Sequence, residues 1–322
     1  RAASVVQPRS NSSPTTGTER IERGKPRSIS FSGSGRRSWL GANNGPDVES
    51  SRSGDDTARV SRPTRGEICV DLSAEHEALA DVIDGLASSD WRRATPSPEW
   101  SIAEQISHLA FFDHRAALAL TDPDAFVADR ARLIEAAPRD LSVELSRLVS
   151  ADELLGEWAT NRDRLLRAAR DVDESVRVPW YGPSMAVSSF LTARLMETWA
   201  HGCDVADALE RPIVPSARLR HVAHIGVSAR PYSLMVNGRE ADTRPVHVEL
   251  TAPDGDLWAW GEPDAEGGAV SGSALDFCLV VTQRRHLADT SLNIRGDAAL
   301  TWMDIAQAFA GPAGPGRPPL DR

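Results

Sequence analysis

The feature that most constrains the fold is a run of long amphipathic segments between residues 67 and 213, separated by short polar breaks. In each segment apolar residues recur every three or four positions, the period of an α-helix that buries one face. Two segments begin with Ser101-x-x-Glu104 and Ser150-x-x-Glu153, the sequence signature of a capping box. Four main helices joined by polar connections predict a helix bundle over residues 67–213.

The pattern changes after Pro215, where strand signals appear among shorter helical segments. The expected strands are 246–250, 257–260 and 291–295, and the expected helices are about 216–230, 274–285 and 297–309. Strands mixed with segregated helices indicate a small α+β domain over residues 214–311, followed by a breaker-rich flexible end at 312–322. The expected fold class is therefore α+β and mainly α.

Charge is divided unevenly along the chain. Residues 1–66 hold twelve basic and six acidic side chains, which leaves 24 basic and 40 acidic for the other residues. The first part is rich in Ser, Arg, Gly and Pro, so we expect a disordered tail that cannot bury enough apolar surface to fold. We interpret it as an inert or wrongly assigned extension, with a functional basic tail as the alternative. The acidic body makes a non-specific nucleic-acid binder a poor interpretation.

Cysteine content and hydropathy restrict the class of protein further. The three cysteines, Cys69, Cys203 and Cys278, form no CxxC pair, which argues against a disulfide framework and against a cysteine-held metal or iron–sulfur site. No apolar run reaches the roughly 18–20 residues of a membrane span, and the N-terminus lacks the apolar core of a signal peptide. We therefore expect a cytoplasmic protein that does not enter the membrane.

Glu197 and His201 are the first candidate site residues. Their spacing of four places both on one face of a helix. That face otherwise carries small and apolar residues, and a carboxylate buried there needs a partner. His108 flanks the apolar stripe of the second expected helix, so the three side chains can converge on one metal ion if these helices face each other. The spacing alone is equally typical of a solvated pair or of a satisfied core contact.

Two histidines and one carboxylate are the ligands of a catalytic zinc site with one open position. The same set also suits Ni(II), Fe(II) or Mn(II), so the residues leave the metal open. Asp204 lies near Glu197 on the helical wheel and could orient a ligand, or form an ordinary salt bridge. His221 and His224 are also suitably spaced for metal binding, but no third ligand is apparent.

Two sequence segments carry a family resemblance: EWSIAEQISHLAFFD at 99–113 and ARLMETWAHGCDVADAL at 193–209. Residues of about 70–311 resemble the mycothiol-dependent maleylpyruvate isomerase family, a group of DinB-like metal-binding four-helix bundles. The resemblance implies a divalent metal, most simply zinc, held by His108, Glu197 and His201, and mycothiol as the thiol cofactor. The nearest subgroup contains metal-binding proteins without an assigned reaction.

Further candidates concern the substrate. Trp180 and Tyr181 precede the fourth long helix and could wall a pocket at the mouth of the bundle, or serve as a core anchor. Arg284 and Arg285 could reach an acidic substrate, a role that the resemblance implies for an arginine of this region. A helix C-terminus also favours cations by itself. No glycine-rich phosphate loop, dinucleotide fingerprint or serine-hydrolase elbow is present.

Two function classes remain. The first is a metal-dependent transferase or isomerase that uses a small-molecule thiol, expected to be mycothiol, against a small electrophilic or acidic substrate. The second is a non-catalytic metal- or ligand-binding protein on the same bundle. A general base would separate the two, and the sequence identifies no catalytic residue. It also leaves the substrate and the oligomeric state open.

Overall fold

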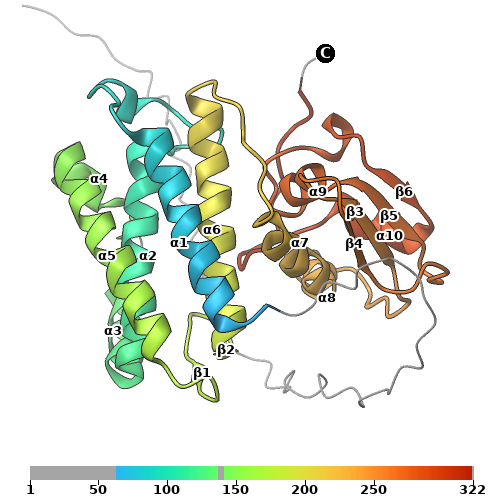
Figure 1. Ribbon diagram of the computed structural model, residues 1–322, viewed down its shortest axis with the longest axis horizontal. Coiled ribbons are helices and arrows are strands. Elements are labelled where there is room, and N and C mark those ends of the chain that lie inside the picture. The colour runs from blue at the N-terminus through green and yellow to red at the C-terminus, as the bar shows by residue number, and fades with distance from the viewer. Residues whose placement is uncertain (1–62, 137–140, 321–322) are drawn as a thin grey trace, which may run out of the picture. The chain divides into compact units, whose positions relative to one another are not determined.

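A computed structural model describes residues 63–136 and 141–320 of the chain (Figure 1). The predicted tail therefore lies outside the described residues except for its last four positions. The described part is mainly helical with two small sheets, which confirms the α+β, mainly α class. Among the described residues, no helix is both long enough and apolar enough to cross a membrane.

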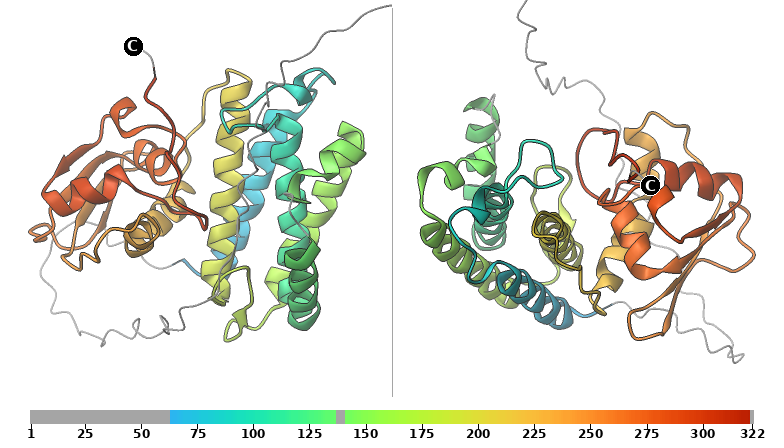
Figure 2. Two further views of the ribbon diagram at one scale, coloured as in Figure 1. Left: turned by 180° about the vertical axis from the view of Figure 1, so that it is seen from behind. Right: turned by 90° about the horizontal axis from the view of Figure 1, so that it is seen from above.

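Four long helices form the bundle. They are α1 (Arg65–Ile83), α2 (Ile102–Thr121), α5 (Ala151–Asp171) and α6 (Val187–Ala208). α2 packs between α5 and α6, and α1 contacts both α5 and α6, which closes the ring of four (Figure 2). Shorter connecting elements are η1 (Asp90–Arg92), α3 (Pro123–Ala136), η2 (Leu141–Val143) and α4 (Leu145–Leu148).

Capping residues fix where these helices begin. Ser101 and Glu104 form the predicted capping box at the start of α2, and Ser150 and Glu153 do the same for α5. Each box pairs two backbone N–H groups that would otherwise lack partners at a helix start. The sequence pattern predicts the fourth long helix from Met185, but α6 begins two residues later, at Val187. Met185–Ala186 instead form strand β2, paired antiparallel with β1 (Arg177–Val178).

The C-terminal part begins with α7 (Leu219–Ser228) and α8 (Arg230–Val236), where the sequence predicted one helix. Its sheet has the order β4-β3-β5-β6, with β3 and β5 parallel and the other pairs antiparallel. The strands are β3 (His247–Thr251), β4 (Leu257–Trp260), β5 (Ala269–Ser273) and β6 (Asn293–Arg295). The remaining helices are α9 (Ala274–Val281), η3 (Leu287–Asp289) and α10 (Asp297–Asp304).

Two differences from the expected C-terminal elements have a local cause. β5 was not predicted because its sequence, AVSGS, has a single branched apolar residue, and only pairing on both sides makes it a strand. The last helix was expected to reach Phe309 but ends at Asp304. After it, Gln307 and Ala308 instead bond to Ser233 and to the carbonyl of Val281.

α6 is shared by both parts of the described chain. The larger apolar core runs from Leu72 and Phe190 in the bundle to Val222 and Phe277 in the C-terminal part. A second core at the other end of the bundle centres on Leu109 and on other buried residues of α1, α2 and α5. Polar side chains on α6 therefore lie between well-packed apolar regions, where every charged group needs a partner.

Candidate metal centre

Four polar residues form a stripe along one face of α6: Arg194, Glu197, His201 and Asp204. Their spacings of three, four and three follow the helical repeat, so the side chains share one face. On α2, Gln105, His108 and Phe112 share a face by the same rule, and the two helices are in contact. The facing stripes bring residues almost one hundred positions apart in the sequence into one site.

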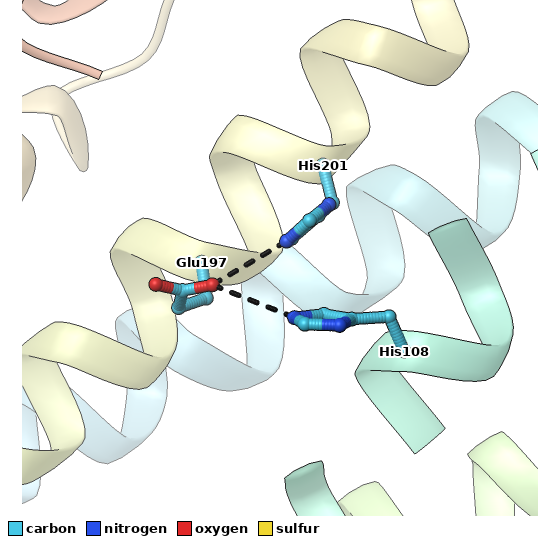
Figure 3. Close-up of side chains that lie close together, drawn as sticks. All are labelled: His108, Glu197 and His201. Carbon is cyan, nitrogen blue, oxygen red and sulfur yellow. Dashed lines mark ion pairs between the residues drawn. The ribbon is translucent and has the colours of Figure 1, made fainter. Parts of the chain in front are cut away.

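His108, Glu197 and His201 lie together, and we call them the donor cluster (Figure 3). The Glu197 Oε2 atom is 3.3 Å from His201 Nε2 and 3.9 Å from His108 Nε2. One ligand atom from each residue lies within 4.8 Å of the others. Ligands about 2.1 Å from one zinc ion stand roughly 3.4 Å apart at a tetrahedral angle, so the donor set fits an ion of this size after small movements.

Hydrogen bonds hold the other nitrogen of each imidazole. His108 Nδ1 lies 2.9 Å from the hydroxyl oxygen of Ser142, and His201 Nδ1 lies 2.5 Å from the carbonyl oxygen of the Gln105 side chain. Because that carbonyl only accepts, His201 Nδ1 is the donor. This tautomer leaves the Nε2 atom of a neutral His201 with its lone pair directed towards the carboxylate of Glu197. A lone pair and a carboxylate oxygen 3.3 Å apart repel each other, and a cation between them would remove the repulsion.

The charge states suit metal binding. Burial, together with the neighbouring His201, lowers the pKa of His108 to about 4, so this imidazole is neutral at neutral pH. Burial raises the pKa of Glu197, but hydrogen bonds with His108 and His201 outweigh it and bring the pKa well below its ordinary value. A neutral imidazole and an ionised carboxylate are the protonation states in which these groups ligate a metal.

A second buried group, the ion-pair cluster, lies about one turn away along α6. Arg194 Nη2 is 2.8 Å from Asp113 Oδ1, and both side chains are almost completely buried. Trp158 Nε1 donates to Asp113 over 3.2 Å, and His76 Nε2 lies 3.6 Å from the same carboxylate. Arg194 shared a helix face with Glu197 in the sequence, but its charge is paired with Asp113 instead.

Asp204 does not contact the donor cluster directly. Burial raises its pKa, but Arg284 and Arg317 outweigh that effect and lower it, so the group is a carboxylate. Its Oδ2 atom accepts from Gln105 over 3.4 Å, and Gln105 in turn binds His201. The predicted role in orienting a ligand therefore depends on Gln105, a residue that no sequence pattern marked.

Aromatic rings pack against both imidazoles of the donor cluster. The centroid of Trp100 is 5.7 Å from that of His201 in a stacked arrangement, and the Phe112 centroid is 4.6 Å from that of His108. Phe112 in turn contacts Trp180 and Tyr181, with centroids 6.0 Å and 5.6 Å away. The two aromatic residues that the sequence singled out thus reach the site through Phe112, and Tyr181 is exposed at its outer edge.

Arg284 and Arg285 lie against α6. Arg284 binds Asp204 over 3.0 Å and the carbonyl oxygen of Ala200 over 3.1 Å. Arg285 makes two hydrogen bonds of 2.6 and 2.7 Å with Asp207. His221 pairs with Asp71 over 2.7 Å and joins α7 to α1. The three cysteines are buried free thiols.

Comparisons with known proteins place most of the bundle in a described domain family. Residues 72–206 match the mycothiol maleylpyruvate isomerase N-terminal domain. Two uncharacterised proteins of Mycobacterium tuberculosis, from strains CDC 1551 / Oshkosh and H37Rv, are 44% identical over 259 residues, covering 78% of this chain and 98% of each relative. Crystal structures of the mycothiol-dependent maleylpyruvate isomerase and of a mutant of it share 15% and 16% identity, each with a TM-score of 0.47, over 69% of this chain and 90% of theirs.

Proposed function

We propose a function from one premise: the chain belongs to the family of proteins that carry the mycothiol maleylpyruvate isomerase N-terminal domain. On this premise the protein is a divalent-metal-binding protein that acts as a thiol-dependent transferase or isomerase. Mycothiol is the expected thiol, and a small electrophilic or acidic compound is the expected substrate. The three free cysteines fit a reducing compartment, for which we propose the cytoplasm.

One observation carries the metal assignment. The Nε2 atoms of His108 and His201 and the carboxylate of Glu197 face one small space, while both Nδ1 atoms are hydrogen-bonded elsewhere. A single proton can join only two of these three donors, whereas a divalent ion uses all of them and leaves a position open. We propose zinc as the ion, and the same donors also accept other divalent metals.

The residues around the donors have separate tasks in this proposal. A divalent ion at this position would bind a thiol and favour its ionised form. His108, Glu197 and His201 hold the ion, and Gln105 orients His201. Trp180 and Tyr181 bind the substrate at the aromatic edge. Arg284 and Arg285 form ion pairs with Asp204 and Asp207 of α6, so we propose that they hold the C-terminal part against the bundle.

A non-catalytic metal- or ligand-binding protein is the second candidate, and a specific observation favours it. The two fully buried carboxylates of α2 and α6, Asp113 and Asp204, are both paired with arginines. Neither is available as a general base, so the reaction would have to proceed without a carboxylate base from these two positions.

Metal analysis of the purified protein followed by a thiol titration tests the proposal. We expect about one equivalent of divalent metal and saturable binding of mycothiol that disappears when a chelator removes the metal. Metal without thiol binding would leave only the non-catalytic candidate. A protein that takes up no divalent metal would contradict the first candidate and the metal-binding form of the second.

A further inference from the structure

Asp204 is a junction between the bundle and the C-terminal part. Its buried carboxylate accepts hydrogen bonds from four side chains that lie on separate segments. Oδ2 accepts from Ser97 over 2.8 Å, from Arg284 over 3.0 Å and from Gln105 over 3.4 Å. Oδ1 accepts from Arg317. Among the described residues, Arg317 is therefore the one side chain that holds the second oxygen.

The orientation of Gln105 follows from this carboxylate. An ionised carboxylate only accepts hydrogen bonds, so Gln105 turns its amide nitrogen towards Asp204. The same nitrogen donates to Thr95 Oγ1 over 2.9 Å. The amide carbonyl must then face the other way, towards His201 Nδ1. Asp204 thus decides, through Gln105, which nitrogen of His201 carries the proton.

We propose that Arg317 is a positioning residue for His201. By holding Oδ1 of Asp204, Arg317 keeps Oδ2 turned towards Gln105, and Gln105 then fixes both the ring orientation and the Nδ1–H form of His201. The inference rests on the proposed function, since it makes the metal ligand dependent on the segment 312–320. A partner behind a metal-binding histidine commonly has this effect on metal affinity.

The segment that carries Arg317 is anchored at Arg317 itself and again at Leu320. Arg317 Nε donates to the carbonyl oxygen of Gln283 over 3.3 Å, and the backbone N–H of Leu320 donates to Asp289 over 2.9 Å. Only 14% of the Arg317 side chain is exposed. We expected a flexible end here, because 312–322 is rich in Gly and Pro. The contacts instead place a charged side chain against the most buried carboxylate of α6.

Arg284 cannot replace Arg317 in this role. It binds the same oxygen as Gln105 and Ser97, and its Nε atom is occupied by the carbonyl of Ala200. Loss of Arg317 would leave Oδ1 without its partner and free the carboxylate to rotate. The amide of Gln105 could then turn, and His201 could move its proton to Nε2, where it would donate to Glu197.

The first experiment measures the His201 tautomer in the full-length, metal-free protein by long-range proton–nitrogen NMR. The measurement is made at alkaline pH, where the spectrum separates the Nδ1–H form of the ring from the Nε2–H form. We expect the wild type to show Nδ1–H and Gln105→Leu to show mainly Nε2–H. Arg317→Ala should give a mixture, and Arg317→Lys should restore much of the wild-type spectrum. Arg239→Ala, an exposed arginine of the C-terminal part, is the control.

The second experiment measures zinc affinity by chelator competition. Loss of a supporting partner costs roughly 10- to 100-fold in metal affinity, so we expect Gln105→Leu in this range and Arg317→Ala at about tenfold. In the Gln105→Leu background, Arg317→Ala should have no further effect, because its influence passes through Gln105. Arg239→Ala should bind zinc like the wild type.

The outcomes separate this inference from the proposed function. A wild-type tautomer together with wild-type zinc affinity in Arg317→Ala would overturn it. So would an equal loss of affinity with and without Gln105, since Arg317 would then act by another route. If the wild type itself binds no divalent metal, the proposed function fails, and the tautomer of metal-free Arg317→Ala alone decides whether the positioning exists.

Discussion

The ion-pair cluster and the donor cluster lie about one turn apart on α6 and solve the same problem differently. In the first, the charge of Arg194 is balanced by the carboxylate of Asp113, and the pair is almost fully buried. In the second, Glu197 faces two imidazoles, and its side chain remains 27% exposed. A buried charge with a protein partner indicates structure, whereas donors that face each other at a partly open position indicate a ligand.

The largest expected effect is on stability, from breaking the ion-pair cluster. Asp113→Ala leaves the buried guanidinium of Arg194 uncompensated, so we expect the free energy of unfolding to fall by about 3–5 kcal/mol. Urea denaturation of the metal-free protein measures it. The double variant Asp113→Leu/Arg194→Met removes both charges and should be more stable than the single variant. Equal stability of the two would show that the pair is not the cause.

The next largest effect is on zinc affinity, which should depend on the donor cluster. Glu197→Ala and His201→Ala should each reduce zinc affinity by more than the roughly 10- to 100-fold expected for a supporting residue, because each removes a ligand. Both should keep the helical circular dichroism spectrum of the wild type. Glu210→Ala, whose side chain is 87% exposed, is the matched control. Stoichiometric zinc retained by both ligand variants would refute the site.

The pH dependence of stability should come in part from His76 in the ion-pair cluster. Burial lowers its pKa from 6.5 to about 4, although Asp113 opposes the shift. As pH falls between these values, the unfolded chain binds the proton and the folded protein does not, so the free energy of unfolding decreases. We expect a loss of about 3 kcal/mol across this window. Phenylalanine does not titrate. The unfolding free energy of His76→Phe, measured with chelator present, should therefore fall by about 3 kcal/mol less than that of the wild type across the same pH window.

The smallest effect tests whether the clusters are independent. The Phe112 ring contacts His108 and lies 6.0 Å from the guanidinium of Arg194. Phe112→Leu keeps an apolar side chain between them, so we expect a stability loss of less than about 1.5 kcal/mol. Zinc affinity should change by less than about threefold, below the cost of a lost supporting partner. A tenfold change in chelator competition would mean that packing between the clusters controls the donors.

How much the sequence could predict depended on whether the signal was local. The spacing of Glu197 and His201, and the capping boxes at Ser101 and Ser150, lie within single helices and could be read directly. The place of His108 beside the apolar stripe of the second helix made it the third candidate, and the resemblance implied the same residue. Gln105 lies three positions before His108 on the same face of α2, and it is completely buried. That spacing was the one available signal, since a glutamine by itself marks no chemistry.

Other parts of the fold depend on contacts that no local pattern records. β5 is a strand because β3 and β6 pair with it on either side, although its own sequence is small and polar. The pairing of Arg194 with Asp113 joins positions 81 residues apart, so the helical wheel of α6 alone could not show it. Arg317 lies in a Gly- and Pro-rich stretch whose composition predicts flexibility.

The junction at Asp204 has a consequence for the order in which the site is assembled during translation. Ser97 and Gln105 precede Asp204 in the chain, Arg284 follows it, and Arg317 comes 113 positions after it. The ribosome therefore releases the bundle with its three donors before the last partner of Asp204 has been synthesised. A metal ion that binds at that stage would do so before Arg317 holds Asp204 and, through Gln105, orients His201. Tight metal binding would therefore begin only after the segment 312–320 has docked.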